Sequence, residues 1–273
     1  MAQSLARLIG VSRDLLRLDS ARLEKTTQAD EVVRRTVASA QRLDLISLAG
    51  GVGCSHISAR IAVLLAHRRG ARVLGIDAGN GQVFTRLTLA APAPTTPVPQ
   101  PVRPVHSLHA PVATNSFDET SLLVGMEGLR VVRPSCDAGP VVRPLDWRRE
   151  VEPVTRHFDI VVTDWGHRSP GIDFEAAIEG SRAVALVCRA DRASVEVAVS
   201  IASAVPCDIC IVDVNHSGRR AASAAASWTN LPVWYIPSMD TPAEPIAPPG
   251  VRTTILALAS SLLASATKDQ ADT

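Results

Sequence analysis

The residues most suited to chemistry form a glycine-rich stretch, Ala49-Gly50-Gly51-Val52-Gly53-Cys54-Ser55. It follows a β-rich run over residues 43–48 and precedes a helix-like run over residues 55–69. Glycines between a strand and a helix let backbone N–H groups converge on phosphate oxygens, and the helix start adds a favourable dipole. The spacing therefore predicts a phosphate-binding loop (P-loop) at residues 49–55. His56, in the first helical turn, either contacts a phosphate or is an ordinary surface histidine.

The predicted loop lacks the lysine that its chemistry normally needs. A working P-loop places a lysine beside the last glycine to draw charge from the β- and γ-phosphates, and Cys54 stands there instead. The only lysines in the chain are Lys25 and Lys268, so none in the body of the chain can substitute. Arginine could compensate, and the sequence offers three candidates near predicted strand ends, namely Arg86, Arg189 and Arg192.

Three oxygen-bearing side chains are placed to hold a magnesium ion. Ser55 follows the loop, Asp77 ends the run from residue 72, and Asp164 ends a Walker B-like run over residues 158–163. Because ligands bind at the carboxyl ends of strands in open α/β sheets, we expect these oxygens to converge, with Mg²⁺ as their natural ligand. Asp77 would be the catalytic carboxylate if the site is active. Trp165 and His167 either cap this pocket or pack beneath a loop.

The fold class follows from alternating β-rich and helix-like runs. They predict an α/β protein with a doubly wound, mostly parallel sheet in a three-layer sandwich, preceded by an N-terminal helical extension. Helices are expected over residues 55–69, 147–157, 192–204, 217–228 and 252–266. Strands are expected over residues 43–48, 72–76, 129–132, 158–163, 183–188, 208–214 and 233–236.

The chain also divides into segments with different predicted structure. Residues 1–40 form the helical extension and residues 41–266 the main domain, followed by a tail over residues 267–273 that we expect to be disordered. Residues 91–111 carry seven prolines, which exclude helix and central strand and indicate an exposed insertion.

Composition narrows the class of function. The 273 residues are 46% hydrophobic and 20% charged with a net charge of +1, so nothing global suggests a nucleic-acid or membrane partner. The apolar runs are shorter than a membrane span, and arginines interrupt the N-terminus where a signal peptide would be apolar. We expect a cytoplasmic protein.

Residues 43 to about 240 resemble the ParA/MinD family of deviant Walker ATPases, whose loop reads K-G-G-x-G-K-[T/S]. Gly50, Gly51, Gly53 and Ser55 match that motif, whereas both family lysines are replaced, by Ala49 and Cys54. The resemblance implies a P-loop NTPase fold, ATP and Mg²⁺ as cofactors, and a nucleotide-dependent homodimer. It also matches Asp77 to the switch I aspartate and Asp164 to the Walker B aspartate, and places Asn215 and Pro237 near the adenine.

The flanking sequence is similar to the MinD-like proteins of actinobacterial type VII secretion loci, and tight-adherence pilus localisation proteins of the same superfamily are an alternative. With both lysines replaced, we expect a pseudo-ATPase or weak nucleotide binder that acts through protein partners in secretion or subcellular positioning. Two alternatives stay open: a slow Mg-dependent ATPase that uses arginine, and a dimerisation module with an empty site. The last helix lacks the basic face of a membrane anchor, so recruitment to a membrane would depend on partners.

The cysteines suggest a different kind of site. Cys207 and Cys210 form a C-x-x-C pair, which would suit a redox centre or an iron–sulfur carrier of the related Mrp type. Iron–sulfur carriers of the Mrp type keep their loop lysines, so we rank this hypothesis below the pseudo-ATPase. Cys54 at a helix start would have a lowered thiol pKa if it were reactive, or would simply fill the space left by the lysine.

Overall fold

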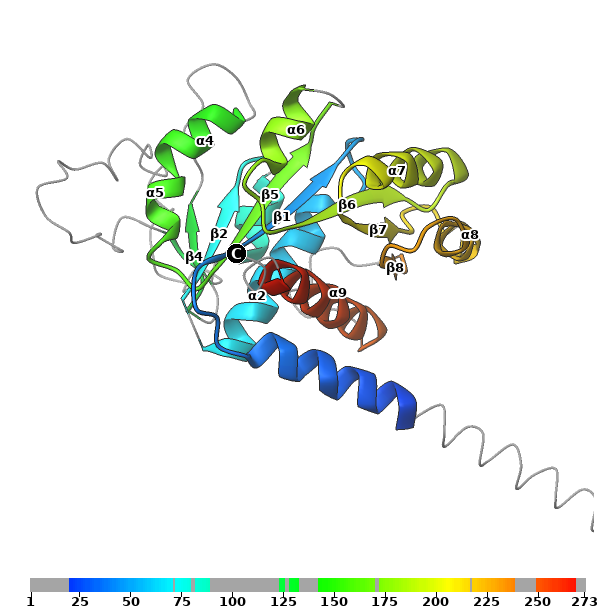
Figure 1. The fold of residues 1–273 in the computed structure, drawn as a ribbon, viewed down its shortest axis with the longest axis horizontal. Helices are drawn as coiled ribbons and strands as arrows, with labels where there is room; N and C mark the ends of the chain where they lie inside the picture. The colour runs from blue at the N-terminus through cyan, green and yellow to red at the C-terminus, as the bar shows by residue number, and fades with distance from the viewer. Residues whose placement is uncertain are drawn as a thin grey trace, which may run out of the picture.

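The computed structural model describes residues 20–70, 72–79, 82–88, 123–125, 128–132, 142–169, 172–216, 218–238 and 249–268. The proline-rich segment over residues 91–111 lies outside these ranges, as do residues 1–19 and 269–273. Within them the chain forms an eight-stranded sheet with helices on both faces (Figure 1).

The sheet order is β3-β4-β2-β5-β1-β6-β7-β8. Its strands are β1 (Gln41–Ser47), β2 (Val73–Asp77), β3 (Leu123–Val124), β4 (Arg130–Val132), β5 (Ile160–His167), β6 (Ala183–Arg189), β7 (Asp208–Val212) and β8 (Val233–Ile236). All neighbouring pairs are parallel except β3 with β4. The parallel strands therefore present their carboxyl ends at one edge, with β1 in the interior of the sheet.

The helices divide into two layers, which confirms the doubly wound prediction. One layer holds α2 (Cys54–Arg69), α3 (Gln82–Thr88), α9 (Pro249–Lys268) and the helix over residues 20–34. The other holds α4 (Pro144–Glu150), α5 (Glu152–Thr155), α6 (Ile172–Ile178), α7 (Arg192–Ala204) and α8 (Arg220–Trp228). Each layer buries its own hydrophobic core against the sheet.

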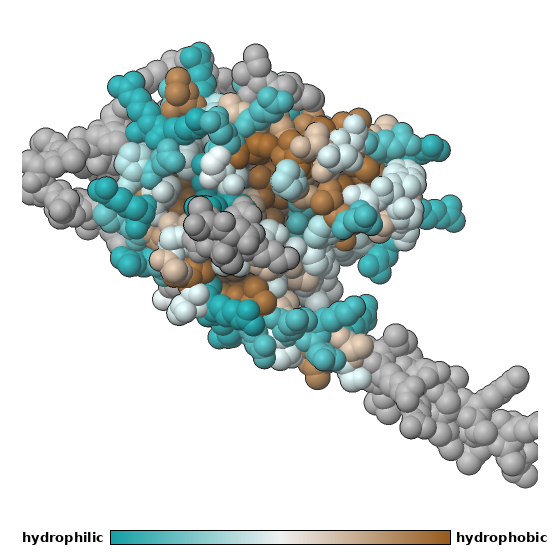
Figure 2. All heavy atoms as spheres, in the orientation of Figure 1, coloured by the Kyte–Doolittle hydropathy of each residue, from teal (hydrophilic) through white to brown (hydrophobic). Residues whose placement is uncertain are grey.

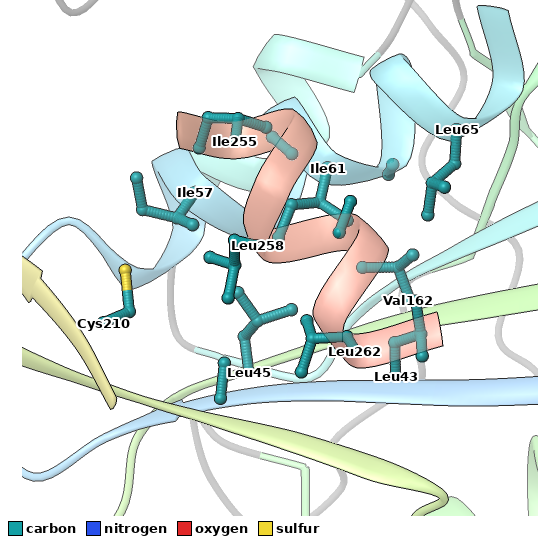
Figure 3. Packing of buried hydrophobic residues seen from close by; sticks show 14 of the residues in the cluster. Leu43, Leu45, Ile57, Ile61, Leu65, Val162, Cys210, Ile255, Leu258 and Leu262 are labelled. Atoms are coloured by element: carbon teal, nitrogen blue, oxygen red, sulfur yellow. The ribbon is translucent and has the colours of Figure 1, made fainter. Parts of the chain in front are cut away.

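Packing of α2 and α9 on β1 holds the centre of the first core. Ile57 and Ile61 of α2 and Leu258 of α9 are fully buried, and they lie over Leu45 of β1 (Figure 3). The helix α2 ends where the sequence indicates, because Gly70 adopts φ 54° and donates its N–H to the Ala66 carbonyl. The strand that leads into the glycine loop and the helix that leaves it are thus held rigidly.

The C-terminal helix α9 is long and apolar enough over residues 250–267 to cross a membrane by length and composition alone, and 44% of that stretch is buried in the fold. Leu256, Leu258, Leu262 and Leu263 are all buried against the sheet layer. Its apolar composition is accounted for by its place in the core.

The helix over residues 20–34 extends from the body, with only its C-terminal part packed on the first core (Figure 1). Ala29 and Val33 are buried, whereas Leu23 is 68% exposed. Its viewed face is largely hydrophilic (Figure 2).

Several element predictions need correction. The helices α3 and α6 were not expected, the single helix over residues 147–157 is two short ones, and α9 continues through Thr267 into the expected tail. Strand β5 runs on to His167, so Asp164 lies inside the strand rather than at its end. Strand β5 also contains a β-bulge, because Leu45 pairs with Asp164 but Ile46 pairs with Gly166, which leaves Trp165 as the extra residue.

Candidate functional site

A cleft of about 390 Å³ opens at the carboxyl edge of the sheet, over the glycine loop. The whole loop from Ala49 to His56 lines it, together with Ser47, Val83, Gly166, His167, Val212, Asp213, Val214 and Ser238. Within the loop, Gly51 and Gly53 adopt φ of 68° and 92°, a region in which a side chain is strained. Gly53 also caps α2, so the start of that helix faces the cleft as a phosphate site requires.

The charges on the cleft wall do not favour an anion. No lysine or arginine is among the described residues that line the cleft, and the ionisable ones are Cys54, His56, His167 and Asp213. Burial, and then the nearby Arg60, lower the pKa of His56, so it is neutral at neutral pH. Among the described residues, the cleft wall therefore offers backbone N–H groups and no lysine or arginine side chain, although Arg189 contacts the loop at the Gly50 carbonyl.

Cys54 turns inward, away from the position that a lysine ammonium would take. Its side chain is buried and bonds to the Asp164 carboxylate and the Ser58 hydroxyl. Burial raises the pKa of this thiol well above its usual 9.0, and the Asp164 charge raises it further. This excludes a reactive, lowered-pKa cysteine and supports the interpretation that Cys54 fills space.

Asp164 is fully buried beneath the loop. Its Oδ1 accepts hydrogen bonds from the Gly166 N–H at 3.1 Å and from Ser58 Oγ at 3.4 Å. Burial raises the pKa of this carboxyl, while contacts from Ser55, Gly166, Cys54 and Ser58 oppose the rise. Asp164 and the Ser55 hydroxyl are thus adjacent, as predicted.

These residues fit a magnesium ion. Asp164 Oδ2 is buried and has no hydrogen-bond partner among the described residues. This oxygen is therefore available to bind a cation. Asp77 pairs with Asp164 in the register of β2 and β5, so the two carboxylates are neighbours. Hard oxygen ligands of this kind suit Mg²⁺. Asp77 is itself fully buried, and its Oδ2 accepts a hydrogen bond from Thr85 Oγ1 at 2.7 Å.

Trp165 and His167, which follow Asp164, lie in different surroundings. Trp165 is fully buried in the second core, where its ring lies 5.8 Å from that of Trp147, so it does not cap the pocket. His167 is exposed and lines the cleft.

Arg168, which sequence reasoning missed, ties the loops around the site together. It is 5% exposed, and its guanidinium donates to the Ala78 carbonyl at 2.9 Å and the Trp165 carbonyl at 3.1 Å. Its backbone N–H donates to the Ser47 carbonyl at 2.8 Å. The ends of β1, β2 and β5 are thereby joined through the backbone and side chain of one residue. A buried arginine in a loop has no sequence signature that marks this role.

The arginines proposed to compensate for lysine differ in position. Arg189 reaches the loop, where its Nη2 donates to the Gly50 carbonyl at 2.9 Å. Arg192 is exposed and pairs with Glu196 at 2.6 Å. Arg86 belongs to α3, and its side chain lies outside the described residues.

The predicted base-binding residues lie beside the cleft, but neither lines it. Asn215 is exposed beyond β7 and Pro237 is half-buried after β8. Their neighbours Asp213 and Ser238 form that wall instead. Asp213 Oδ2 accepts hydrogen bonds from the Gly218 N–H and the Tyr235 hydroxyl, each at 2.8 Å.

The C-x-x-C pair is separated by the sheet. Cys207 belongs to the core beneath α7 and α8, whereas Cys210 belongs to the core beneath α2 and α9. Burial raises the pKa of Cys207 to about 12 and that of Cys210 well above its usual value. A disulfide or a shared metal within this pair is therefore excluded by position, and no group of three or more His, Cys, Asp or Glu side chains that could hold a metal ion occurs among the described residues.

Comparison with known proteins identifies the fold. No family model matches the sequence, and a search of curated proteins finds no match. Solved structures do match. MinD from Pyrococcus horikoshii OT3, complexed with Mg-ADP, is 13% identical with a TM-score of 0.59, covering 81% of this chain and 94% of that chain.

Two further solved structures have the same fold as this chain. Pyrococcus furiosus MinD is 16% identical with a TM-score of 0.58, covering 81% of this chain and 98% of that chain. A ParA family ATPase from Chlorobium tepidum TLS is 14% identical with a TM-score of 0.57, covering 81% and 91%. This chain therefore has the P-loop fold of the MinD and ParA ATPases.

Proposed function

We propose that this chain is a MinD/ParA-like nucleotide-binding protein that has lost most or all ATP hydrolysis and acts through protein partners. The observation that carries the proposal is the glycine loop itself. Its backbone cradle is intact and opens into a cleft, while the side chain at its lysine position is a thiol turned inward onto Asp164.

The energetic consequence falls on catalysis more than on binding. Each lost contact between a charged group and a phosphate is worth about 1.5–3 kcal/mol. Both family lysines are missing, at Ala49 and Cys54. Charge on the transferring phosphoryl oxygens is what those groups complement in the transition state, so turnover is expected to fall furthest.

Metal binding belongs to the same proposal. Ser55, Asp77 and Asp164 would hold Mg²⁺, which would neutralise phosphate charge when bound. Because Asp77 and Asp164 are fully buried, the loops that cover them have to move for an ion to enter. The Pyrococcus horikoshii MinD was solved in complex with Mg-ADP, which supports testing Mg²⁺ together with ADP first.

Protein partners are the remaining part of the function. The Aquifex aeolicus MinD, whose structure this chain matches with a TM-score of 0.51, was solved in complex with MinC. We propose a cytoplasmic protein, able to form a homodimer and recruited to the membrane by partners. Its resemblance to type VII secretion MinD-like proteins makes secretion components the first partners to test, with subcellular positioning systems second.

One observation favours a second candidate, a slow Mg-dependent ATPase. Arg189 lies against the loop and could replace part of the missing charge. The third candidate, a dimerisation module with an empty site, has no comparable support.

Isothermal titration with ATP and Mg²⁺, followed by a turnover assay, separates the three. Measurable but weak binding without turnover is the expected result. Turnover that disappears in Asp77→Ala would overturn the first candidate in favour of the second, and an absence of any binding would favour the third.

A further inference from the structure

We propose that Arg189 binds the phosphate groups of a nucleoside di- or triphosphate in the glycine-loop cleft, as the cation that the loop lacks. This assignment rests on the proposed nucleotide binding and names the residue that makes it possible.

Sheet register brings Arg189 to the loop. Strand β6 lies beside β1, and Ser47, the last residue of β1, pairs with Val187 (Figure 1). Arg189 ends β6 two residues further on, so it extends past the end of β1 to the level of the loop. Its Nη2 lies 2.9 Å from the Gly50 carbonyl, and a Cβ built on Gly51 would lie 3.9 Å from the same nitrogen. The guanidinium therefore contacts the Gly50 carbonyl and lies beside Gly51, although Arg189 is not itself among the residues that line the cleft.

The guanidinium has hydrogen-bonding capacity left over. Arginine carries five N–H donors in a planar fork that matches phosphate oxygens. The Gly50 carbonyl takes a bond from one nitrogen, and the buried Nε has no hydrogen-bond partner among the described residues. A group with unused donors beside a phosphate cradle is suited to bind an anion there.

The neighbouring charges leave this arginine available. Asp191 is the nearby carboxylate, but it caps α7 and accepts bonds from the Ser194 N–H at 2.9 Å and from the Ser194 hydroxyl at 2.8 Å. Arg192 is paired with Glu196 on the surface, and Arg168 is committed to two backbone carbonyls. Of these three arginines, Arg189 is thus the one whose position and bonding both suit the ligand.

The test compares two variants that separate charge from backbone support. Arg189→Gln keeps an N–H₂ donor on a shorter side chain but removes the charge, and Arg189→Lys keeps the charge. Arg192→Gln is the matched control, because it removes a similar charge three residues away. Affinities for MgADP, MgATP and AMP are measured by isothermal titration at low and moderate salt, with thermal melting to check folding.

We expect Arg189→Gln to weaken MgADP and MgATP binding at least about tenfold and to reduce the salt dependence of binding, with AMP changed less. Arg189→Lys should retain most of the affinity, and Arg192→Gln should match the wild type. If Arg189→Gln binds like the wild type, or weakens AMP and ADP equally, the assignment is wrong although nucleotide binding stands. If the wild type binds none of these ligands, the proposed function falls and takes the assignment with it.

Discussion

Cys54 shows at the scale of one residue how a P-loop can keep its shape without its charge. The loop backbone depends on Gly51 and Gly53, which adopt positive φ, and not on the side chain at position 54. A small thiol can then turn under α2 to meet Asp164, where a lysine ammonium would instead extend over the phosphates. The fold is retained while the chemistry is altered.

The burial of Cys54 leads to a prediction about its reactivity. Burial raises the pKa of the thiol well above 9.0, so very little thiolate exists at neutral pH, and the thiolate is the nucleophile. Alkylation of the native protein by iodoacetamide should leave Cys54 unmodified under conditions that label it fully in urea, as read by peptide mass spectrometry. Rapid native labelling of Cys54 would show that the side chain faces the cleft.

Single residues also mark the limit of sequence reasoning about the site. Ser55, Asp77 and Asp164 could be predicted because each stands at a fixed distance from a glycine loop or a strand. Arg168 could not, because its role depends on contacts with Ala78 and Trp165, which only the folded chain brings near it.

At the scale of elements, the segment after β2 packs against the end of β5 with little free space. Gly79 follows β2, and a Cβ placed on it would lie 3.1 Å from the Gly166 Cα and 3.2 Å from the Gly166 N, both in β5. Because those neighbours are backbone atoms, they have to move if Gly79 is replaced. The close approach of these two segments therefore depends on glycine at position 79.

Gly79→Ala should therefore destabilise the protein by about 1–3 kcal/mol, the usual cost of overpacking. Gly250→Ala is the matched control, since a Cβ at Gly250 meets no atom within 4 Å and alanine favours the helix α9. Urea denaturation of both variants measures the difference. A Gly79→Ala protein as stable as the wild type would mean that the segment after β2 and the end of β5 are not in close contact.

Asp208 couples three elements and gives a prediction about pH. Its Oδ2 accepts a hydrogen bond from Trp234 Nε1 of β8 at 2.8 Å. Burial raises the pKa of Asp208 from 3.8, opposed by hydrogen bonds from Ser261 of α9 and from Trp234. In the window above 3.8 and up to this raised pKa, the native state holds the proton more often than the unfolded state does.

Stability contributed by Asp208 should therefore fall as pH rises through that window. The measurement is the free energy of unfolding of the wild type minus that of Asp208→Asn, followed from about pH 4 to neutral pH. We expect this difference to decrease with rising pH, because only the wild type pays the cost of a buried charge. A difference that increases would mean that the folded pKa is lowered.

Elements were predicted well where their periodicity was long. The helix α2 and its end at Gly70 follow from the sequence, as does α7 at Arg192–Ala204. The helices α3 and α6 were missed because each is seven residues long, too short for a helical period to show. The bulge at Trp165 was missed because it arises from pairing with β1.

At the scale of the whole molecule, the sheet order explains why the site lies where it does. From β1 the chain crosses to β2 on one side, returns through β5, and then continues to β6 on the other side. The carboxyl end of β1 is next to the ends of both β5 and β6, so the glycine loop meets Asp164 from one neighbour and Arg189 from the other. Alternating strands and helices predicted this class of fold, but the order of strands, and hence the approach of Arg189, required the structure.

The central claim is that the loop retains a phosphate cradle without the lysines that normally complement phosphate charge, and MgATP affinity with a lysine restored at position 54 tests it most directly. Cys54→Lys should bind MgATP at least about tenfold more tightly than the wild type by isothermal titration, since it regains one charge-assisted contact. Cys54→Ala, which removes the thiol without adding charge, should bind like the wild type. Equal affinity of Cys54→Lys and wild type, or ATP turnover by the wild type, would contradict the claim.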